Sequence, residues 1–238
     1  MREQFFASMT LGQFEKGLSE KEWAVLLVDP STNEIQGFST LKRIRAVLDG
    51  QRIVAYFSGE TAIDPSFWGQ MELPRAAGRH IMILAAAERD SPAYWFLITS
   101  SYRTYRFLPL FFEDYYPGCG SPAAGEIKRV LDHLALQEFG REYDPARGVI
   151  RFDGATPLLR KYAEIPARRL KDPDVAFFAV ANSGHLLGEE LACLAPLYFE
   201  NLTPAGRRVL AGALGTPNEK PPGSPEGFVT RWMGSSTS

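Results

Sequence analysis

The segment Ser-Tyr-Arg-Thr-Tyr-Arg, residues 101–106, places two phenols and two guanidinium groups close together. Tyr102 and Tyr105 are three residues apart, and so are Arg103 and Arg106. On a strand the two tyrosines would face opposite sides, whereas on a helix they would share one face. Guanidinium groups form paired hydrogen bonds with carboxylates and phosphates, so the arginines are expected to hold an acidic acceptor or a phosphate. The alternative for each tyrosine is a ring packed in the core with its hydroxyl bonded to the main chain.

A second group of polar residues begins with the turn sequence Asn-Ser-Gly at residues 182–184. His185 and Glu189 follow with i,i+4 spacing, so a helix would place them on one face. His185 is a candidate base or acceptor-site residue, with local pairing as the alternative. A metal site would need a third ligand that the sequence does not offer, so no metal is expected. A hydrolase or lyase that uses His185 with Glu60 or Asp114 is one hypothesis for such a site.

Composition and charge exclude several classes of protein. The formal net charge is -2 over 238 residues, so there is no cationic excess to neutralise nucleic acid or an anionic membrane surface. Cys119 and Cys193 are far apart and form no CxxC motif, which is typical of reduced thiols in the cytoplasm. The first residues carry charges every few positions, unlike a signal peptide, and no apolar run is long enough to span a membrane. The GxSxG, HExxH, Walker and GxGxxG motifs are absent, which disfavours serine hydrolases, zinc proteases and nucleotide-binding enzymes.

The first part of the chain predicts a helix and three antiparallel strands. Apolar residues recur at helical spacing over residues 3–22. The run Trp-Ala-Val-Leu-Leu-Val-Asp at 23–29 predicts a strand buried on both faces, and a turn leads from it to a second strand at 35–50. Asp49-Gly50 is a tight-turn pair that joins the second strand to a third at 51–63. Residues 23–63 are therefore predicted to form a three-strand meander.

The rest of the chain predicts alternating helices and strands. A helical stretch begins at Pro65, and Pro74 is expected to break or kink it. The further predicted elements are a strand at 93–101, a short helix within 102–118, a helix at 123–140, a strand at 148–154, a helix and loop over 155–173, a buried strand at 175–182, a helix or loop at 183–198 and a short helix at 203–214. Residues 215–238 are rich in Pro, Gly and Ser and predict a flexible tail.

This order of elements predicts an α/β fold with a mixed, mostly antiparallel sheet flanked by helices. A meander, a crossover helix and a returning strand make the first half. We expect residues 1–118 to form this half. Residues 119–214 would complete the sheet or cover the acceptor site, with the tail beyond them.

The meander and the junction after it resemble the GCN5-related N-acyltransferase (GNAT) superfamily. In that family a central strand ends in an apolar-x-Pro sequence, and a glycine-rich loop then opens a helix whose amides hold the pyrophosphate of acyl-coenzyme A. Ile63-Asp64-Pro65 matches the strand end, and Gly69 matches the first glycine of the loop. The sequence departs from the pattern at Trp68, where Arg is usual, and at Met71 and Leu73, where small residues are usual. The resemblance therefore implies a divergent member with a degenerate pyrophosphate loop.

The resemblance also implies roles for individual residues. The cofactor-binding set is Ile63, Asp64, Phe67, Trp68, Gly69 and Gln70. Glu60, on the central strand, would deprotonate the attacking amine through water, and Tyr105 or Tyr102 would protonate the leaving thiolate. Independently of the resemblance, Arg103, Arg106 and Tyr115 are candidates for binding the substrate, and His185 is a further candidate catalytic residue. The alternatives are a solvated carboxylate for Glu60 and a core plug for Phe67 and Trp68.

The resulting hypothesis is an N-acyltransferase that moves an acyl group from a thioester to an amine by direct attack. The donor would be acyl-CoA or acetyl-CoA, or an acyl-carrier protein, and the acceptor a small-molecule amine. The protein would be a cytoplasmic enzyme of biosynthesis that uses no metal. A homodimer is compatible with this hypothesis. The alternative is a non-catalytic binding or assembly protein that keeps the GNAT scaffold and has lost coenzyme A binding, which the residues at Met71 and Leu73 favour.

Overall fold

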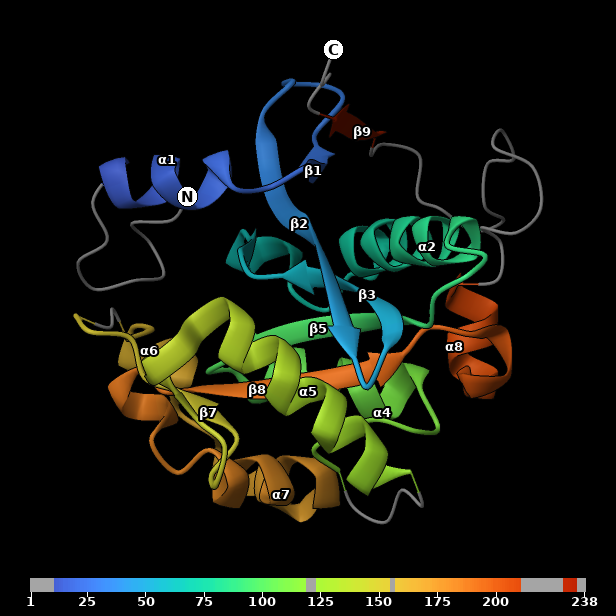
Figure 1. Ribbon diagram of the computed structural model, residues 1–238. Helices are drawn as coiled ribbons and strands as arrows, with labels where there is room; N and C mark the ends of the chain where they lie inside the picture. The colour runs from blue at the N-terminus through green and yellow to red at the C-terminus, as the bar shows by residue number, and fades with distance from the viewer. Residues whose placement is uncertain (1–10, 119–122, 155–156, 211–228, 235–238) are drawn as a thin grey trace.

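A computed structural model describes residues 11–118, 123–154, 157–210 and 229–234 of the chain, and all structural statements concern these residues. Within them, nine strands form one sheet in the order β6-β7-β8-β5-β3-β2-β1-β9, with β4 paired to β2 (Figure 1). The strands are β1 (Trp23–Val28), β2 (Ile35–Leu48), β3 (Gln51–Ser58), β4 (Thr61–Ile63), β5 (Ala93–Thr99), β6 (Tyr143–Asp144), β7 (Val149–Ile150), β8 (Glu190–Pro196) and β9 (Val229–Gly234).

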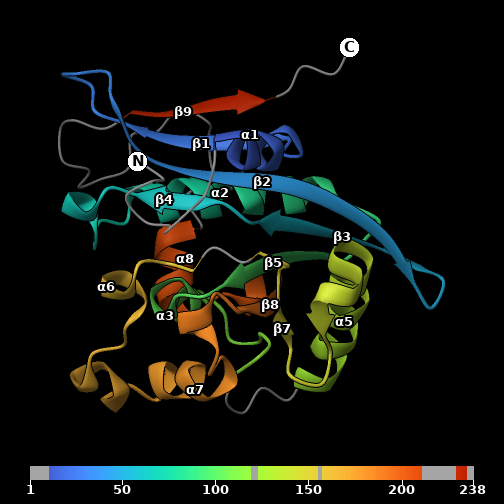
Figure 2. The same ribbon diagram turned by 90° about the vertical axis from the view of Figure 1, so that its left-hand side faces the viewer.

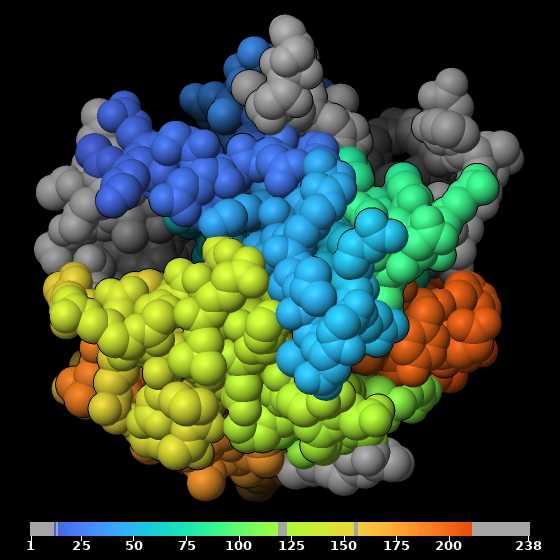
Figure 3. Space-filling model, in the orientation of Figure 1, coloured from blue at the N-terminus to red at the C-terminus, as the bar shows by residue number. Residues whose placement is uncertain are grey.

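Helices cover both faces of this sheet. They are α1 (Leu11–Ser19), α2 (Glu72–Ala87), α3 (Tyr102–Tyr105), α4 (Phe107–Phe111), α5 (Ala124–Phe139), α6 (Arg160–Ala163), α7 (Pro173–Ala181) and α8 (Pro204–Leu210). The 3₁₀ turns are η2 (Pro65–Phe67), η3 (Gly140–Glu142), η4 (Ala167–Lys171), η5 (His185–Leu187) and η6 (Phe199–Asn201). One core joins the sheet to α2, α3, α4, α7 and α8, and a second core joins its other face to α5. Figure 3 shows α1 and α5 covering that second face.

The pairing confirms the predicted fold class. Among the named strands, β3 and β5 are the parallel pair, and every other recorded pairing is antiparallel. The crossover from β3 to β5 runs through α2, as expected for a parallel connection. The chain is therefore an α/β protein with a mixed, mostly antiparallel sheet flanked by helices.

The predicted three-strand meander is present. β1 pairs with β2, and β2 pairs with β3 down to Leu48 opposite Gln51. The turn residues Asp49 and Gly50 both have positive φ, 51° and 79°, which a two-residue hairpin turn that follows the twist of the strands requires. The predicted third strand is interrupted at residues 59–60, so that β3 and β4 are separate pieces.

Pro74 does not break the helix, contrary to the prediction. α2 runs without interruption from Glu72 to Ala87, and Pro74 lies in its first turn. The N–H groups of the first turn have no partner within a helix, so a proline there removes no hydrogen bond.

Two predicted elements of the second half have the wrong type. The segment 175–182, predicted to be a strand, lies in α7 up to Ala181 and ends at the C-cap Asn182. The N-cap of this helix, Asp172, accepts a hydrogen bond from the Asp174 N–H, and its first residue is Pro173. Residues 190–196, predicted to be helix or loop, form β8 between β5 and β7. Short apolar runs fit a buried helix and a buried strand equally well, so periodicity alone does not separate them.

The remaining boundaries differ in smaller ways. α1 and α8 lie within the predicted helices, and residues 1–10 and 211–214 lie outside the described residues. β7 is shorter than the predicted strand at 148–154. The predicted tail is wrong at residues 229–234, which form β9 antiparallel to β1, whereas 215–228 and 235–238 lie outside the described residues.

The cap of α7 leads to a first prediction. Asp172→Ala removes the side-chain acceptor at the helix start and should lower the free energy of unfolding by about 1 kcal/mol. Asp172 also forms an ion pair with Arg106 at 3.1 Å. Asp172→Asn separates the two effects, because it keeps the cap and loses the charge, and it should cost less than half as much. Urea denaturation measures both, and equal losses would contradict a role for the cap.

His80 on α2 leads to a second prediction. Burial lowers its pKa from 6.5 to about 4, and its ring lies 5.9 Å from that of Trp23, centroid to centroid. The unfolded chain therefore takes up the proton at higher pH than the folded chain. The free energy of unfolding is therefore unaffected by His80 above about pH 6.5. It falls by up to about 3 kcal/mol as the pH drops toward 4. Urea denaturation across this range measures the slope, and an unchanged slope in His80→Gln would contradict the assignment.

Candidate active site at an opening in the sheet

The hydrogen-bond ladder between β3 and β5 ends at the last residue of β3, and β5 continues for two residues beyond it. Their pairing runs from Val54 opposite Ala93 to Ser58 opposite Leu97. Beyond it, β4 pairs with β2, while the end of β5 pairs with β8. Figure 2 shows β4 beside β2, whereas β5 and β8 lie below these two strands in the same view. We call the region between residues 59–63 and residues 98–99 the sheet opening. It is an interruption of the ladder, bordered on both faces by side chains.

Glu60 lies at this opening on the face that α1 covers. Its carboxylate accepts a hydrogen bond from Thr40 Oγ1 at 3.2 Å and pairs with Lys21 Nζ at 3.4 Å. The two charged side chains are only 17% and 7% exposed, so this ion pair is largely removed from water. α1 approaches closely at Gly17, where an added Cβ would lie 2.4 Å from Glu60 Oε1. The glycine therefore leaves room for the carboxylate.

Phenylalanines line the same face next to the ion pair. Lys21 Nζ lies 5.3 Å from the centroid of the Phe57 ring. Phe57 contacts Phe96 and Phe139, with centroids 5.2 and 5.8 Å away, and Phe139 contacts Phe152 at 5.8 Å. Phe139 and Phe152 are partly exposed. A charged pair beside an apolar wall would suit a substrate with a polar reacting group and an apolar chain.

Aromatic rings cover the opposite face of the opening. The guanidinium carbon of Arg103 lies 4.8 Å from the ring centroids of both Trp68 and Tyr102, and Arg103 Nη1 donates to the Tyr162 carbonyl at 2.8 Å. Trp68 and Tyr162 meet edge to face at 5.1 Å. These four residues, the Trp68 cluster, link the turn after β4 to α3 and α6. The structure thus gives Arg103 a packing role between rings.

The turn after β4 uses most of its main-chain donors internally. The N–H of Ser66 donates to the Asp64 carboxylate, and the N–H groups of residues 67, 68 and 70 donate to carbonyls within the turn. Trp68 Nε1 donates to the Ile63 carbonyl at 2.9 Å. Gly69 has a φ of 94°, which glycine adopts readily. A phosphate at this turn would have to compete with those bonds.

The start of α2 is also poorly suited to an anion. Glu72 lies in its first turn, and Glu72 Oε2 is buried without a hydrogen-bond partner among the described residues. Pro74 contributes no N–H group to the same turn. A carboxylate at a helix N-terminus occupies the place that favours a bound phosphate and repels a second negative charge.

The other predicted site residues pack around α7. Tyr105 is fully buried against Phe178, and its hydroxyl donates to the Pro117 carbonyl at 2.9 Å. His185 is 8% exposed, and its Nδ1 lies 2.8 Å from the Asn182 carbonyl. Arg106 pairs with the N-cap of α7, as described above, and Tyr115 is buried in the same core.

The predicted pairing of His185 with Glu189 on one helix face is not formed. The helical turn η5 ends at Leu187, and the Glu189 carboxylate binds Arg147 at 2.7 Å and Arg151 at 2.6 Å.

No group of three His, Cys, Asp or Glu side chains is placed to hold a metal ion in the described part of the chain. Burial raises the pKa of the Cys193 thiol, and Cys119 lies outside the described residues.

Sequence reasoning missed several residues of the opening. Lys21, Thr40 and Tyr162 reach it from distant parts of the chain, and Trp95 donates from Nε1 to Ser58 Oγ at 2.8 Å across β3 and β5. None of them stands in a motif. The paired strands and the packing of α1 and α6 bring them together.

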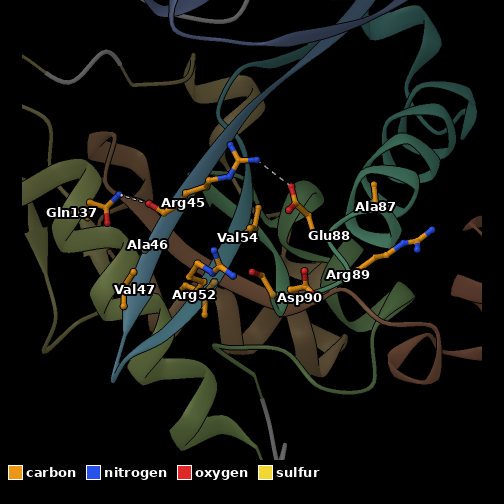
Figure 4. A pocket seen from close by; sticks show the side chains of 12 residues that line it. Arg45, Ala46, Val47, Arg52, Val54, Ala87, Glu88, Arg89, Asp90 and Gln137 are labelled. Atoms are coloured by element: carbon orange, nitrogen blue, oxygen red, sulfur yellow. Dashed lines mark hydrogen bonds and ion pairs between the residues drawn. The ribbon is translucent and has the colours of Figure 1, made fainter.

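A hollow of about 670 Å³ lies at the other end of β3 and β5 (Figure 4). Arg45 pairs there with Glu88 at 3.6 Å, and Arg52 and Asp90 add a further charge of each sign. In Figure 4 the Arg89 side chain points away from this group. The charges of both signs largely offset one another and do not define a ligand.

No family model matches the chain, and no curated protein is similar to it in sequence. One similar solved structure is a mutant of the AtaT toxin bound to the C-terminus of the antitoxin AtaR and acetyl-CoA: 21% identity over 37% of this chain and 54% of the toxin, with a TM-score of 0.28. Another is a conserved protein of unknown function from Enterococcus faecalis, a probable N-acyltransferase: 17% identity over 57% of this chain and 38% of that protein, with a TM-score of 0.35. The chain thus spans 54% of the first protein and 38% of the second. Similarity this weak does not bear on activity.

Among the described residues, no helix combines the length and the apolar character that crossing a membrane requires.

The buried ion pair leads to a third prediction. Lys21→Met leaves the Glu60 carboxylate without its counter-charge and should lower the free energy of unfolding by about 3 kcal/mol. The double variant with Glu60→Gln should recover part of this loss, because neither charge remains. The exposed pair Arg160–Glu164, whose side chains are 83% and 53% exposed, is the control. Arg160→Met should change stability by less than about 0.5 kcal/mol in urea denaturation. Equal effects at the two pairs would show that Glu60 is solvated.

Proposed function

We propose that the protein is an N-acyltransferase that transfers an acyl group from a thioester to an amine at the sheet opening. The observation that carries this proposal is the end of the ladder between β3 and β5 at the Ser58–Leu97 pair, beyond which β4 pairs with β2. Two strand edges diverge there, next to a carboxylate and an apolar wall. An extended thioester arm could lie between the edges and bond to their main-chain groups, much as an added strand does.

Glu60 is the proposed base. Its carboxylate lies at the opening with partners that fix its position, Thr40 and Lys21. An acceptor amine that reaches the thioester carbonyl from the α1 face would pass its proton to this carboxylate, directly or through water. Main-chain N–H groups at residues 59–60 would stabilise the oxyanion that forms on the carbonyl.

Tyr102 is the better of the two candidates for protonating the leaving thiolate. It follows β5 directly and belongs to the Trp68 cluster at the opening. The Tyr105 hydroxyl is bonded to the Pro117 carbonyl within a closed core, which holds its proton away from the opening. We therefore assign the acid role to Tyr102 and a packing role to Tyr105, Tyr115 and His185.

The proposed donor is recognised by its thioester arm more than by a diphosphate. The turn at residues 64–70 bonds its own amides, and Glu72 opposes negative charge at the start of α2. An acyl-pantetheine arm, on coenzyme A or on an acyl-carrier protein, meets this requirement. The phenylalanines beside Glu60 favour an acyl chain longer than acetyl, because each methylene buried against them adds about 0.8 kcal/mol to the binding free energy.

The test compares donors of equal reactivity. Octanoyl-CoA and octanoyl-pantetheine are incubated with a panel of primary amines, and thiol release and amide product are followed. We expect kcat/KM for the two donors to agree within about tenfold, because the diphosphate contributes little binding. Glu60→Gln should lower kcat/KM by about a hundredfold or more, and the exposed Glu164→Gln should leave it unchanged. If neither donor is consumed or raises Tm, the transferase proposal is wrong.

A second candidate is a non-catalytic binding or assembly protein on the same scaffold. The Trp68 cluster favours it, since Arg103, Trp68 and Tyr162 pack against one another on one face of the opening. Under this view saturating thioester produces no thermal shift, whereas a ligand of the native state should add a few kcal/mol of stability. The donor comparison above therefore also decides between the two functions.

A further inference from the structure

We propose that Lys21 is an acyl acceptor within the protein itself and becomes acylated on Nζ by the bound thioester. This inference rests on the proposed function, since the same opening must admit the donor. It adds a modification site and an acceptor that the proposed function does not require.

The position of the Lys21 amine carries the inference. Nζ lies 3.4 Å from Glu60 Oε2, the proposed base, and an added Cβ at Gly59 would lie 3.6 Å from it. The amine is therefore against the main chain at the point where the ladder between β3 and β5 ends. An incoming acceptor amine would need this place, beside both the carboxylate and the thioester carbonyl.

Other lysines of the described residues lack this combination. Lys16, Lys161 and Lys171 are exposed, and Lys128 pairs with Asp132 of its own helix, α5, at 2.6 Å. Lys42 provides the matched comparison, since its Nζ pairs with Glu138 at 2.6 Å and its side chain is 29% exposed. It lies on β2 opposite Phe57, where the strands are still paired, so no thioester arm can reach it through the opening.

The chemical step balances with the thioester as the single co-reactant. The Lys21 ammonium gives one proton to the Glu60 carboxylate, and the neutral nitrogen attacks the thioester carbonyl carbon. The C–N bond forms and the C–S bond breaks. The second proton passes from nitrogen to the leaving thiolate, and Glu60 releases the first proton to water. The products are an amide on Lys21 and a free thiol.

α1 offers a way to disturb this geometry without changing a charge. Gly17→Ala would place a methyl group against Glu60 Oε1 and push the carboxylate away, whereas Gly12→Ala on the same helix meets nothing within 4 Å. Both changes raise helix propensity by a similar amount, so their difference reports on Glu60.

The experiment incubates the full chain with octanoyl-CoA or octanoyl-pantetheine, without an added amine, and maps acylated lysines by peptide mass spectrometry. We expect Lys21 to be acylated at least about tenfold more than Lys42 and the exposed lysines. The preference should vanish in urea-unfolded protein and fall about tenfold or more in Glu60→Gln and Gly17→Ala, but not in Gly12→Ala. Lys21→Arg, which keeps the positive charge, should remove the modification while Tm stays within a few degrees of the parent value.

Two results separate this inference from the proposed function. If the thioester raises Tm or is transferred to external amines while Lys21 stays unmodified, the inference is overturned and the proposed function stands. If acylation follows exposure alone, with Lys16 and Lys161 ahead of Lys21, the inference is likewise overturned. If no thioester binds or reacts, both fall together.

Discussion

The end of the ladder between β3 and β5 at Ser58 is the constraint on which the site depends. After Ser58, the chain turns toward β2, and the Glu60 carbonyl accepts a hydrogen bond from the Thr40 N–H at 3.0 Å. β5 meanwhile stays paired with β8 through Thr99. Each edge is thus held by its outer neighbour, and the inner pairing stops without loss of the outer ladders. This arrangement places Glu60 and Lys21 beside main-chain groups that are not part of a continuous ladder.

The two faces of the opening have different chemistry. On the α1 face, the Glu60–Lys21 pair has little exposure and lies next to phenylalanines. In such an apolar surrounding, a bound ligand strongly affects the energy of the charges and of proton transfer between them. On the other face, the Trp68 cluster joins the turn after β4 to α3 and α6. The turn bonds its own amides, and α2 begins with an acid. Under the proposed function, the donor would therefore be bound through its thioester arm more than through a diphosphate.

Local signals predicted most of the first half of the fold and assigned the wrong type to two segments of the second. The meander has a tight-turn pair and long apolar runs, and its strands were found where predicted, except that the third is divided into β3 and β4. The segments at 175–182 and 190–196 were assigned the wrong type. Val175 and Phe178 are buried under α3, while Leu191 to Ala195 are buried on both faces of the sheet. Residues 175–181 are all apolar although Val180 is 81% exposed, and β8 is buried on both faces. Neither segment shows a period of apolar residues, so the neighbouring elements decide between helix and strand.

The sequence by itself determined the class of fold, the hairpin at Asp49-Gly50 and the position of Glu60 at the end of a central strand. It also identified the junction at 63–70 as the place where the strand meets the helix. Only the tertiary structure decided that Lys21 and Thr40 hold Glu60, that Arg103 lies between rings, and that Tyr105 and His185 belong to the core around α7. These contacts join residues far apart in the chain. Their energies come from burial and pairing that exist only after the elements have packed.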